Sequence, residues 1–123
     1  MATEGMVFRF KNFRVYQDAK SLSLFCRNIV RTRIEKHDRE LANQIYRALI
    51  SIVLNIAEGS ADSSDTEFAR FLGISLRSTY EIVAGFDLAA LYGYIDDDLN
   101  QEIEKKAHEL VKQLASFRNR LKQ

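Results

Sequence analysis

This chain of 123 residues contains no proline, and only five of its residues are glycine. Both residue types supply the backbone geometry of tight turns, so the chain has little material for connecting segments. An all-β sandwich needs a turn about every ten residues and does not fit this composition. The length and the balance of 46% hydrophobic and 28% charged residues are typical of one soluble globular domain. We therefore expect a single domain over residues 1–123, with residues 1–13 as an N-terminal extension.

Four stretches place apolar residues three and four positions apart, which is the spacing of one helix face. The spacing predicts helices near residues 14–36, 39–58, 65–92 and 98–121. In the last stretch the spacings of four and three alternate strictly, which is a heptad pattern. Since short joints force neighbouring helices to run antiparallel, the predicted fold class is all-α, an up-down four-helix bundle.

Three features predict helix ends. Ser64 and Glu67 fit a capping box at the start of the third helix, and Asp98 and Gln101 make a second capping pair. Gly59 suits the left-handed position just past the end of the second helix.

Residues able to support catalysis or metal binding are few. Cys26 has no second cysteine to pair with, and His37 and His108 are the only histidines. A di-iron bundle needs Glu-x-x-His on two helices, whereas Glu104 precedes His108 by four residues and the pair occurs once. The acids of residues 96–98 are interpreted as favourable charges at a helix N-terminus rather than as a cation site. We expect no enzymatic activity, no cofactor and no metal.

No apolar run approaches the about 18 residues that a membrane span requires. The N-terminal residues lack an apolar core followed by a small-residue cleavage site, so no export signal is recognised. The expected location is the cytoplasm, without membrane contact.

Charge is distributed unevenly along the chain, although the net charge is only +1. Residues 1–37 and 99–123 are basic, and residues 59–98 are acidic. An up-down bundle brings both termini to one end, where the chain gathers six cations. This predicted basic end consists of Arg9, Lys11, Arg14, Arg118, Arg120 and Lys122.

Three acids, Glu58, Asp62 and Asp65, belong to the same end and would weaken its positive field. The alternative interpretation is that the six cations are merely solvated terminal residues. If nucleic acid binds elsewhere, the first helix offers a second basic group in Arg27, Arg31 and Arg33.

Polar residues recur at regular positions in the apolar second helix. They occur in Gln44-Ile45, Arg47-Ala48, Ser51-Ile52 and the block Asn55-Ile56-Ala57-Glu58-Gly59. With Glu67-Phe68-x-Arg70-Phe71-Leu72 and Ser78-x-x-Glu81, this pattern resembles the bacterial four-helix bundle family, the 23S rRNA intervening-sequence proteins. The start Phe13-Arg14-Val15-Tyr16-Gln17 is similar as well, so the resemblance covers nearly the whole chain.

The resemblance implies an up-down bundle that assembles as a homo-oligomeric ring, a pentamer in some members. Members are encoded in intervening sequences of 23S rRNA genes or elsewhere in bacterial genomes. A related branch, the accessory variability proteins of diversity-generating retroelements, binds a reverse transcriptase and nucleic acid. A ring would repeat one basic bundle end and so concentrate positive charge on one face. The leading hypothesis is a non-enzymatic ring that binds RNA or DNA, and the alternative is a protein-binding adaptor or assembly subunit.

The motif itself also permits a structural role. Counted from the shared loop at 1.5 Å per residue, Glu58 is level with Arg70, and Arg47 is within about one turn of Glu81. We predict Glu58–Arg70 and Arg47–Glu81 contacts. Asn55 is flanked by core residues and is expected to be partly buried with a hydrogen-bond partner. The structural residues of the motif are Arg47, Asn55, Glu58, Gly59, Arg70 and Glu81.

Overall fold

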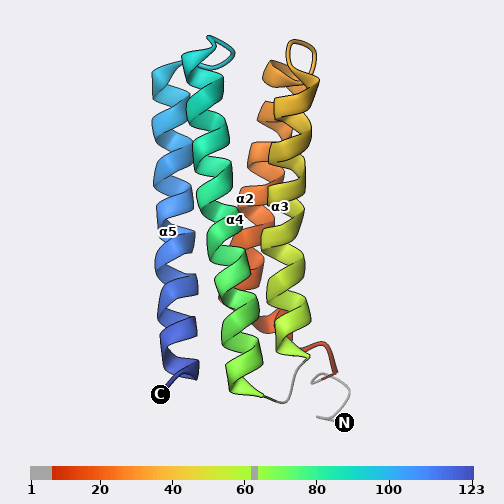
Figure 1. Ribbon diagram of the computed structural model, residues 1–123, viewed down its shortest axis with the longest axis vertical. Helices are drawn as coiled ribbons and strands as arrows, with labels where there is room; N and C mark the ends of the chain where they lie inside the picture. Colours follow the sequence, from red (N-terminus) through yellow and green to blue (C-terminus); the bar gives the residue numbers. More distant parts are fainter. Residues whose placement is uncertain (1–6, 62–63) are drawn as a thin grey trace.

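The computed structural model describes residues 7–61 and 64–123, and its four long helices run antiparallel to their neighbours (Figure 1). They are α2 (Arg14–Ile29), α3 (Arg39–Ser60), α4 (Asp65–Leu91) and α5 (Asp97–Leu121). The predicted all-α up-down bundle is confirmed, and the described residues include no strand. A 3₁₀ helix, η1 (Arg9–Asn12), precedes α2, and a π-helix, η2 (Val30–Ile34), prolongs it. The start of α2 and the end of α5 lie at the same end of the bundle (Figure 1).

The apolar stripes of the four helices meet in one core. The seam of α5 is buried as predicted, at Ile103, Ala107, Leu110 and Leu114. Phe68 and Phe86 of α4 are the largest fully buried side chains. Burial of one such side chain stabilises the fold by about 1.5–3 kcal/mol, so the core is the main source of stability.

The terminal end of the bundle is closed by three aromatic rings from different elements. Phe13, the residue before α2, stacks on Phe68 of α4 with ring centroids 6.2 Å apart, and its edge meets Phe117 of α5 at 5.4 Å. Phe68 and Phe117 are 5.1 Å apart. The last residue of the N-terminal extension is therefore part of the packed domain.

Gly59 does not end the second helix, contrary to the sequence prediction. It lies inside α3, which continues to Ser60, and the only described residue with positive φ is Gly93 (φ 84°) in the turn after α4. Gly59 instead permits close packing, because a Cβ there would lie 2.6 Å from the Cβ of Phe71 in α4. Gly85 plays the same part from α4, since its Cβ would lie 2.8 Å from Cγ1 of Ile45.

The capping residues agree with the prediction at one helix and differ at another. Ser64 caps α4, and its Oγ accepts from the Glu67 amide at 3.3 Å. At α5 the cap is Asp96 rather than Asp98, because Oδ1 of Asp96 accepts from the Leu99 amide at 2.8 Å. The extended backbone at Asp96 lets the helix begin at Asp97, one residue before the predicted start.

Candidate nucleic-acid interface

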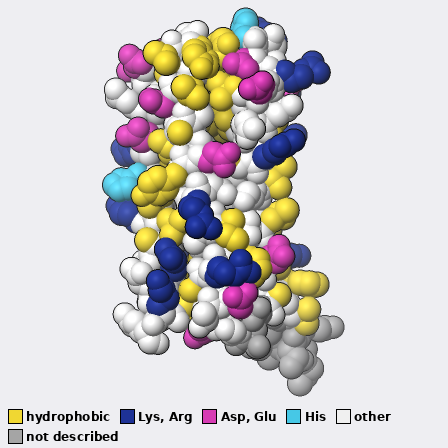
Figure 2. Space-filling view, in the orientation of Figure 1, with side chains coloured by type: hydrophobic (Ala, Val, Ile, Leu, Met, Phe, Trp, Pro, Cys, Tyr) yellow, Lys and Arg dark blue, Asp and Glu magenta, His cyan; other side chains and the backbone are white. Residues whose placement is uncertain are grey.

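The C-terminal turns of α5 are the basic part of the terminal end. Arg118 and Arg120 occupy the last turn of α5, and Lys122 is its C-cap residue. Cations at this position interact favourably with the partial negative charge of a helix C-terminus. In Figure 2, Lys and Arg side chains gather over the lower half of the visible face, and acidic side chains are more frequent in its upper half.

A hollow of about 520 Å³ separates the start of α2 from the end of α5, and we call it the α2–α5 hollow. Arg14, Lys112 and Arg120 line it, together with one acid, Glu109. The Arg14 side chain is 87% exposed and its Nε lies 3.5 Å from Oδ2 of Asp18. Nζ of Lys112 lies 3.1 Å from Oε1 of Glu109. Nη1 of Arg120 donates to Oγ of Ser116 at 3.0 Å. Exposed contacts of this kind hold their partners weakly, so the three cations remain available to a ligand.

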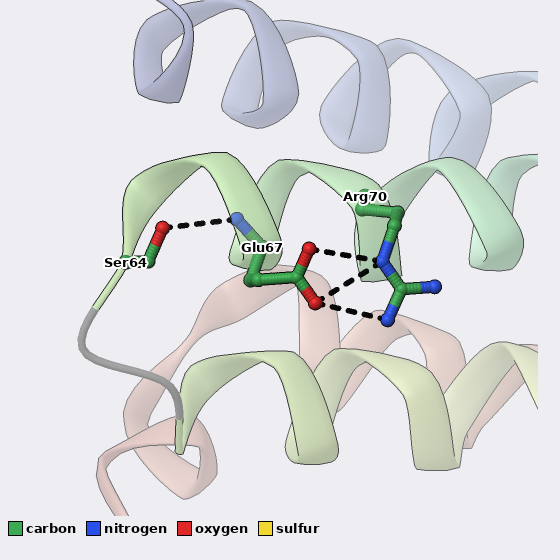
Figure 3. A network of polar contacts seen from close by, with 3 residues as sticks. All are labelled: Ser64, Glu67 and Arg70. Atoms are coloured by element: carbon green, nitrogen blue, oxygen red, sulfur yellow. Dashed lines mark hydrogen bonds and ion pairs between the residues drawn. The ribbon is translucent and has the colours of Figure 1, made fainter.

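A second hollow, of about 690 Å³, lies between the start of α4 and the end of α5, and we call it the α4–α5 hollow. Its cations are Arg70, Arg118 and Lys122, and its acids are Asp65 and Glu67. Arg70 holds Glu67 in a two-pronged ion pair, with its Nε and Nη2 3.0–3.2 Å from the two carboxylate oxygens (Figure 3). This hollow is therefore less positive than the α2–α5 hollow.

Arg118 is the least exposed cation of the six predicted. Its guanidinium lies over Gly73 of α4, where Nε would be 3.6 Å from an added Cβ. That Nε is buried and has no hydrogen-bond partner among the described residues. The absence of a side chain at Gly73 gives the guanidinium its place against α4.

Arg9 and Lys11 line neither hollow. Nε of Arg9 donates to the carbonyl oxygen of Ser60 at 3.0 Å, and its guanidinium lies 5.5 Å from the ring centroid of Phe68. Arg9 thus joins η1 to the end of α3 and serves the packing of the bundle end. Nζ of Lys11 lies 5.7 Å from the ring centroid of Phe8.

The six predicted cations therefore do not form one patch. The structure groups Arg14 with Arg120, and Arg118 with Lys122, on two sides of α5. Of the three acids, Asp65 lines the α4–α5 hollow, Glu58 is exposed at the end of α3, and Asp62 lies outside the described residues.

Two cations of these hollows differ from the sequence expectation, since Lys112 is not among the six predicted and Arg70 is expected to be structural only. Lys112, Ser116 and Arg120 are spaced four residues apart, which puts them on one face of a helix. That spacing is the signal by which Lys112 could be found. No sequence pattern indicates that Arg70 faces the end of α5, because this depends on how α4 packs against α5.

The alternative basic group on the first helix is partly engaged with neighbours. The Arg27 guanidinium lies 4.8 Å from the ring centroid of Tyr46, and Nη2 of Arg31 donates to Oδ1 of Asn28 at 3.4 Å. The Tyr46 hydroxyl donates to Oε1 of Glu35 at 2.7 Å. Desolvation and this hydrogen bond raise the pKa of Tyr46 above its usual value.

The predicted Glu58–Arg70 and Arg47–Glu81 contacts are wrong. Among the described residues no ion pair joins either couple, and Arg70 pairs with Glu67 of its own helix. Glu58, Arg47 and Glu81 are all exposed. Helical level alone does not fix the contacts, because these side chains point away from the α3–α4 interface.

Small polar residues explain the recurrent positions of the motif instead. Asn55 is half-buried and its Nδ2 donates to the Ser51 carbonyl at 2.8 Å and to Ser51 Oγ at 3.1 Å. Ser78 of α4 donates to the same Oγ at 2.8 Å, and the buried Ser75 donates to the Ile52 carbonyl at 2.8 Å. The bonds of Ser75 and Ser78 join α4 to α3, and those of Asn55 lie within α3, so this part of the motif is structural.

The described residues contain no group of three His, Cys, Asp or Glu side chains arranged to hold a metal ion. Cys26 is fully buried in the core, and desolvation raises the pKa of its thiol to about 12, with a smaller opposing effect from Lys106. Within the described part of the chain, no helix has the length and apolar character needed to cross a membrane.

Comparisons with known proteins agree with this architecture. A crystal structure of a protein of unknown function from the S23 ribosomal protein family, from Bacteroides thetaiotaomicron, superposes with a TM-score of 0.78. The alignment covers 85% of this chain and 95% of that chain at 24% sequence identity, which supports the shared fold. No curated protein matches the chain. Residues 11–116 match the model of the 23S rRNA-intervening sequence proteins, and the chain belongs to that family.

Proposed function

We propose that this protein is a non-enzymatic, homo-oligomeric bundle that binds RNA or DNA through the α2–α5 hollow. The observation that carries the proposal is that Arg14, Lys112 and Arg120 line one hollow that includes a single acid, Glu109. Two of the three are arginines, whose planar guanidinium groups match phosphate oxygens. The hollow also contains the Ser116 hydroxyl, a donor suited to a sugar-phosphate backbone, whereas Nε2 of Gln113 donates to Oδ2 of Asp18 at 2.7 Å.

Assembly is part of this proposal, because one copy has a net charge of only +1. Contacts to phosphate give affinity by releasing counterions, and three cations on one copy release few. A ring repeats the hollow in each copy and raises the affinity through multivalency. We propose that the nucleic acid is either the intervening RNA or the template of a reverse transcriptase. In the second case the protein is an accessory partner of that reverse transcriptase, and in both cases it acts in the cytoplasm.

A salt titration tests the proposal. Fluorescence anisotropy with a mixed-sequence RNA and a DNA of equal length compares the wild type with the triple variant Arg14→Gln, Lys112→Gln and Arg120→Gln. The slope of log affinity against log salt should flatten by about 0.7–0.9 for each phosphate interaction that the substitutions remove. We expect the affinity of the triple variant to fall for both nucleic acids.

The matched control is the triple variant Lys36→Gln, Arg39→Gln and Lys105→Gln. These three exposed cations line neither hollow and do not belong to the alternative basic group of the first helix. The control removes the same formal charge and should retain affinity and slope. An equal loss in both variants would assign binding to net charge rather than to the hollow. Unchanged binding in the first variant would contradict the assignment, and the absence of any binding by the wild type would overturn the function.

A further inference from the structure

Apart from Val7 and Phe8, the exposed large apolar side chains of the described residues form two groups. The first comprises Leu24 of α2 with Ile50 and Leu54 of α3, and the second lies on α4 and the turn that follows it. Contiguous exposed apolar patches on a small protein mark surfaces that contact a partner. The two groups differ in shape and in charge.

The first group lines a groove of about 360 Å³ between α2 and α3, which we call the α2–α3 groove. Leu24, Ile50 and Leu54 are 64%, 49% and 56% exposed. Lys20 and Arg27 are the charged residues of the lining, which includes no acid. The groove is therefore apolar along its floor and positive along the edge formed by α2.

The second group forms a ridge along α4. Tyr80, Ala84, Leu88 and Leu91 follow one another at spacings of four, four and three, so they share one side of the helix, and we call them the α4 ridge. Tyr80, Leu88 and Leu91 are 66%, 41% and 76% exposed. In Figure 2 hydrophobic and acidic side chains lie together in the upper half of the visible face.

The α4 ridge is flanked by negative charge. Glu81 and Asp87 are exposed, and at 100° per residue they fall on opposite sides of the ridge. Asp87 accepts one hydrogen bond, from Nδ2 of Asn100 at 3.2 Å. Residues 78–104 contain seven acids and no Lys or Arg. The nearest cations are Arg77, which is exposed one turn before Tyr80, and Lys105, which lines a hollow with Tyr80 and Asp87.

We propose that the α2–α3 groove of one copy receives the α4 ridge of a second copy. A ridge of side chains spaced four apart fits a groove between helices, which is how helices pack in general. Lys20 and Arg27 lie along the α2 edge of the groove, whereas Glu81 and Asp87 lie on opposite sides of the ridge. One of the two acids therefore faces the α2 edge when the ridge enters the groove, and the charges that meet there are opposite in sign.

The groove and the ridge are different surfaces, so the contact is heterologous. A heterologous contact repeats from copy to copy and closes into a ring when the rotation permits. This inference rests on the self-association within the proposed function and names the surfaces that produce it. It leaves the α2–α5 hollow outside the contact, since none of the hollow's residues belongs to the groove or to the ridge.

Two single variants and their mixture test the contact by analytical ultracentrifugation. Leu54→Asp places an acid in the groove opposite the acidic ridge, and Leu88→Asp places an uncompensated charge on the ridge. Both positions are exposed, so each variant should fold, which circular dichroism and a thermal melt confirm. Val7→Asp, at a residue that is 68% exposed and outside both patches, is the matched control.

We expect the wild type and Val7→Asp to form an oligomer larger than a dimer and each test variant to sediment as a 14.2 kDa monomer. An equimolar mixture of the two variants should form a species of two chains. It retains one intact contact, between the groove of Leu88→Asp and the ridge of Leu54→Asp.

Each other outcome has a separate meaning. A wild-type oligomer that both variants preserve would overturn the groove-and-ridge assignment and leave self-association standing. Variants that dissociate but do not pair when mixed would also overturn it, because they indicate an isologous contact. A monomeric wild type at about 100 µM, well above the range of stable oligomers, would refute both this contact and the assembly in the proposed function. Nucleic-acid binding by such a monomer would still support the α2–α5 hollow.

Discussion

Gly59 of α3 lies so close to Phe71 of α4 that a Cβ at position 59 would be 2.6 Å from the Cβ of Phe71. Both atoms are fixed to helical backbones, so neither can move away without separating the helices. Gly59→Ala should therefore lower the free energy of unfolding by about 1–3 kcal/mol, the usual cost of overpacking. Urea denaturation followed by circular dichroism measures this difference.

Gly73→Ala is the matched control for that substitution. The nearest atoms to a Cβ at position 73 belong to the Arg118 guanidinium, at 3.6–3.9 Å, which is ordinary contact. The gain in helix propensity should stabilise the protein by up to about 1 kcal/mol. An equal change in stability for both alanines would show that close packing at position 59 adds no cost.

Asp96 and Asp98 are neighbouring acids at the start of α5 with different roles. Asp96 Oδ1 accepts from the Leu99 amide, whereas Asp98 lies in the first turn. Asp96→Ala should cost about 1 kcal/mol of stability, as other cap removals do. Asp98→Ala should cost less, about 0.3–0.5 kcal/mol, since it loses only the interaction with the helix dipole. Thermal melts of the two variants decide which aspartate caps the helix.

The stability of the protein should depend on the chemistry of the side chain at position 55 more than on its size. Its Nδ2 donates to both the carbonyl and the hydroxyl of Ser51. Asn55→Ala removes these bonds and should cost about 0.5–1.5 kcal/mol. Asn55→Asp should cost more at pH 7, because a carboxylate is an acceptor only. Protonation restores a donor, so the stability of Asn55→Asp relative to wild type should rise as the pH is lowered, and a pH-independent difference would contradict this prediction.

Cys26 should be unreactive in the folded protein. Its thiol is 0% exposed, and burial raises its pKa from 9.0 to about 12. A disulfide reagent at pH 8 should label it only after unfolding, and the labelling rate should follow the fraction unfolded. Rapid stoichiometric labelling of native protein would show that the core near Cys26 opens.

The same pKa shift makes stability depend on pH. The folded state holds the proton more tightly than the unfolded state, so the contribution is complete below pH 9 and is lost between about pH 9 and 12. Cys26→Ala removes this dependence, although it lowers stability at every pH by leaving a small cavity. A difference between the two proteins that stays constant above pH 9 would argue against the shifted pKa.

Local patterns determined the helices and much of the core. The stripes that include Val15, Ala19 and Leu22 in α2, and Ile103 and Ala107 in α5, predicted faces that are buried in the structure. This works because helix periodicity is a property of the chain itself, and an apolar stripe has few ways to leave water. Short joints then fixed the antiparallel order, and with it the meeting of the start of α2 and the end of α5 at one end.

The tertiary structure alone decided what crosses between helices. Glu58 and Arg70 are level along the bundle, yet Arg70 pairs with Glu67, since rotation of a helix about its axis decides where a side chain points. Sequence alone suggests a turn at Gly59 because glycine suits both turns and close contacts, and only the position of Phe71 distinguishes the two. The grouping of Arg14 with Arg120 across α2 and α5 likewise depends on how two distant helices pack, which a one-dimensional pattern does not contain.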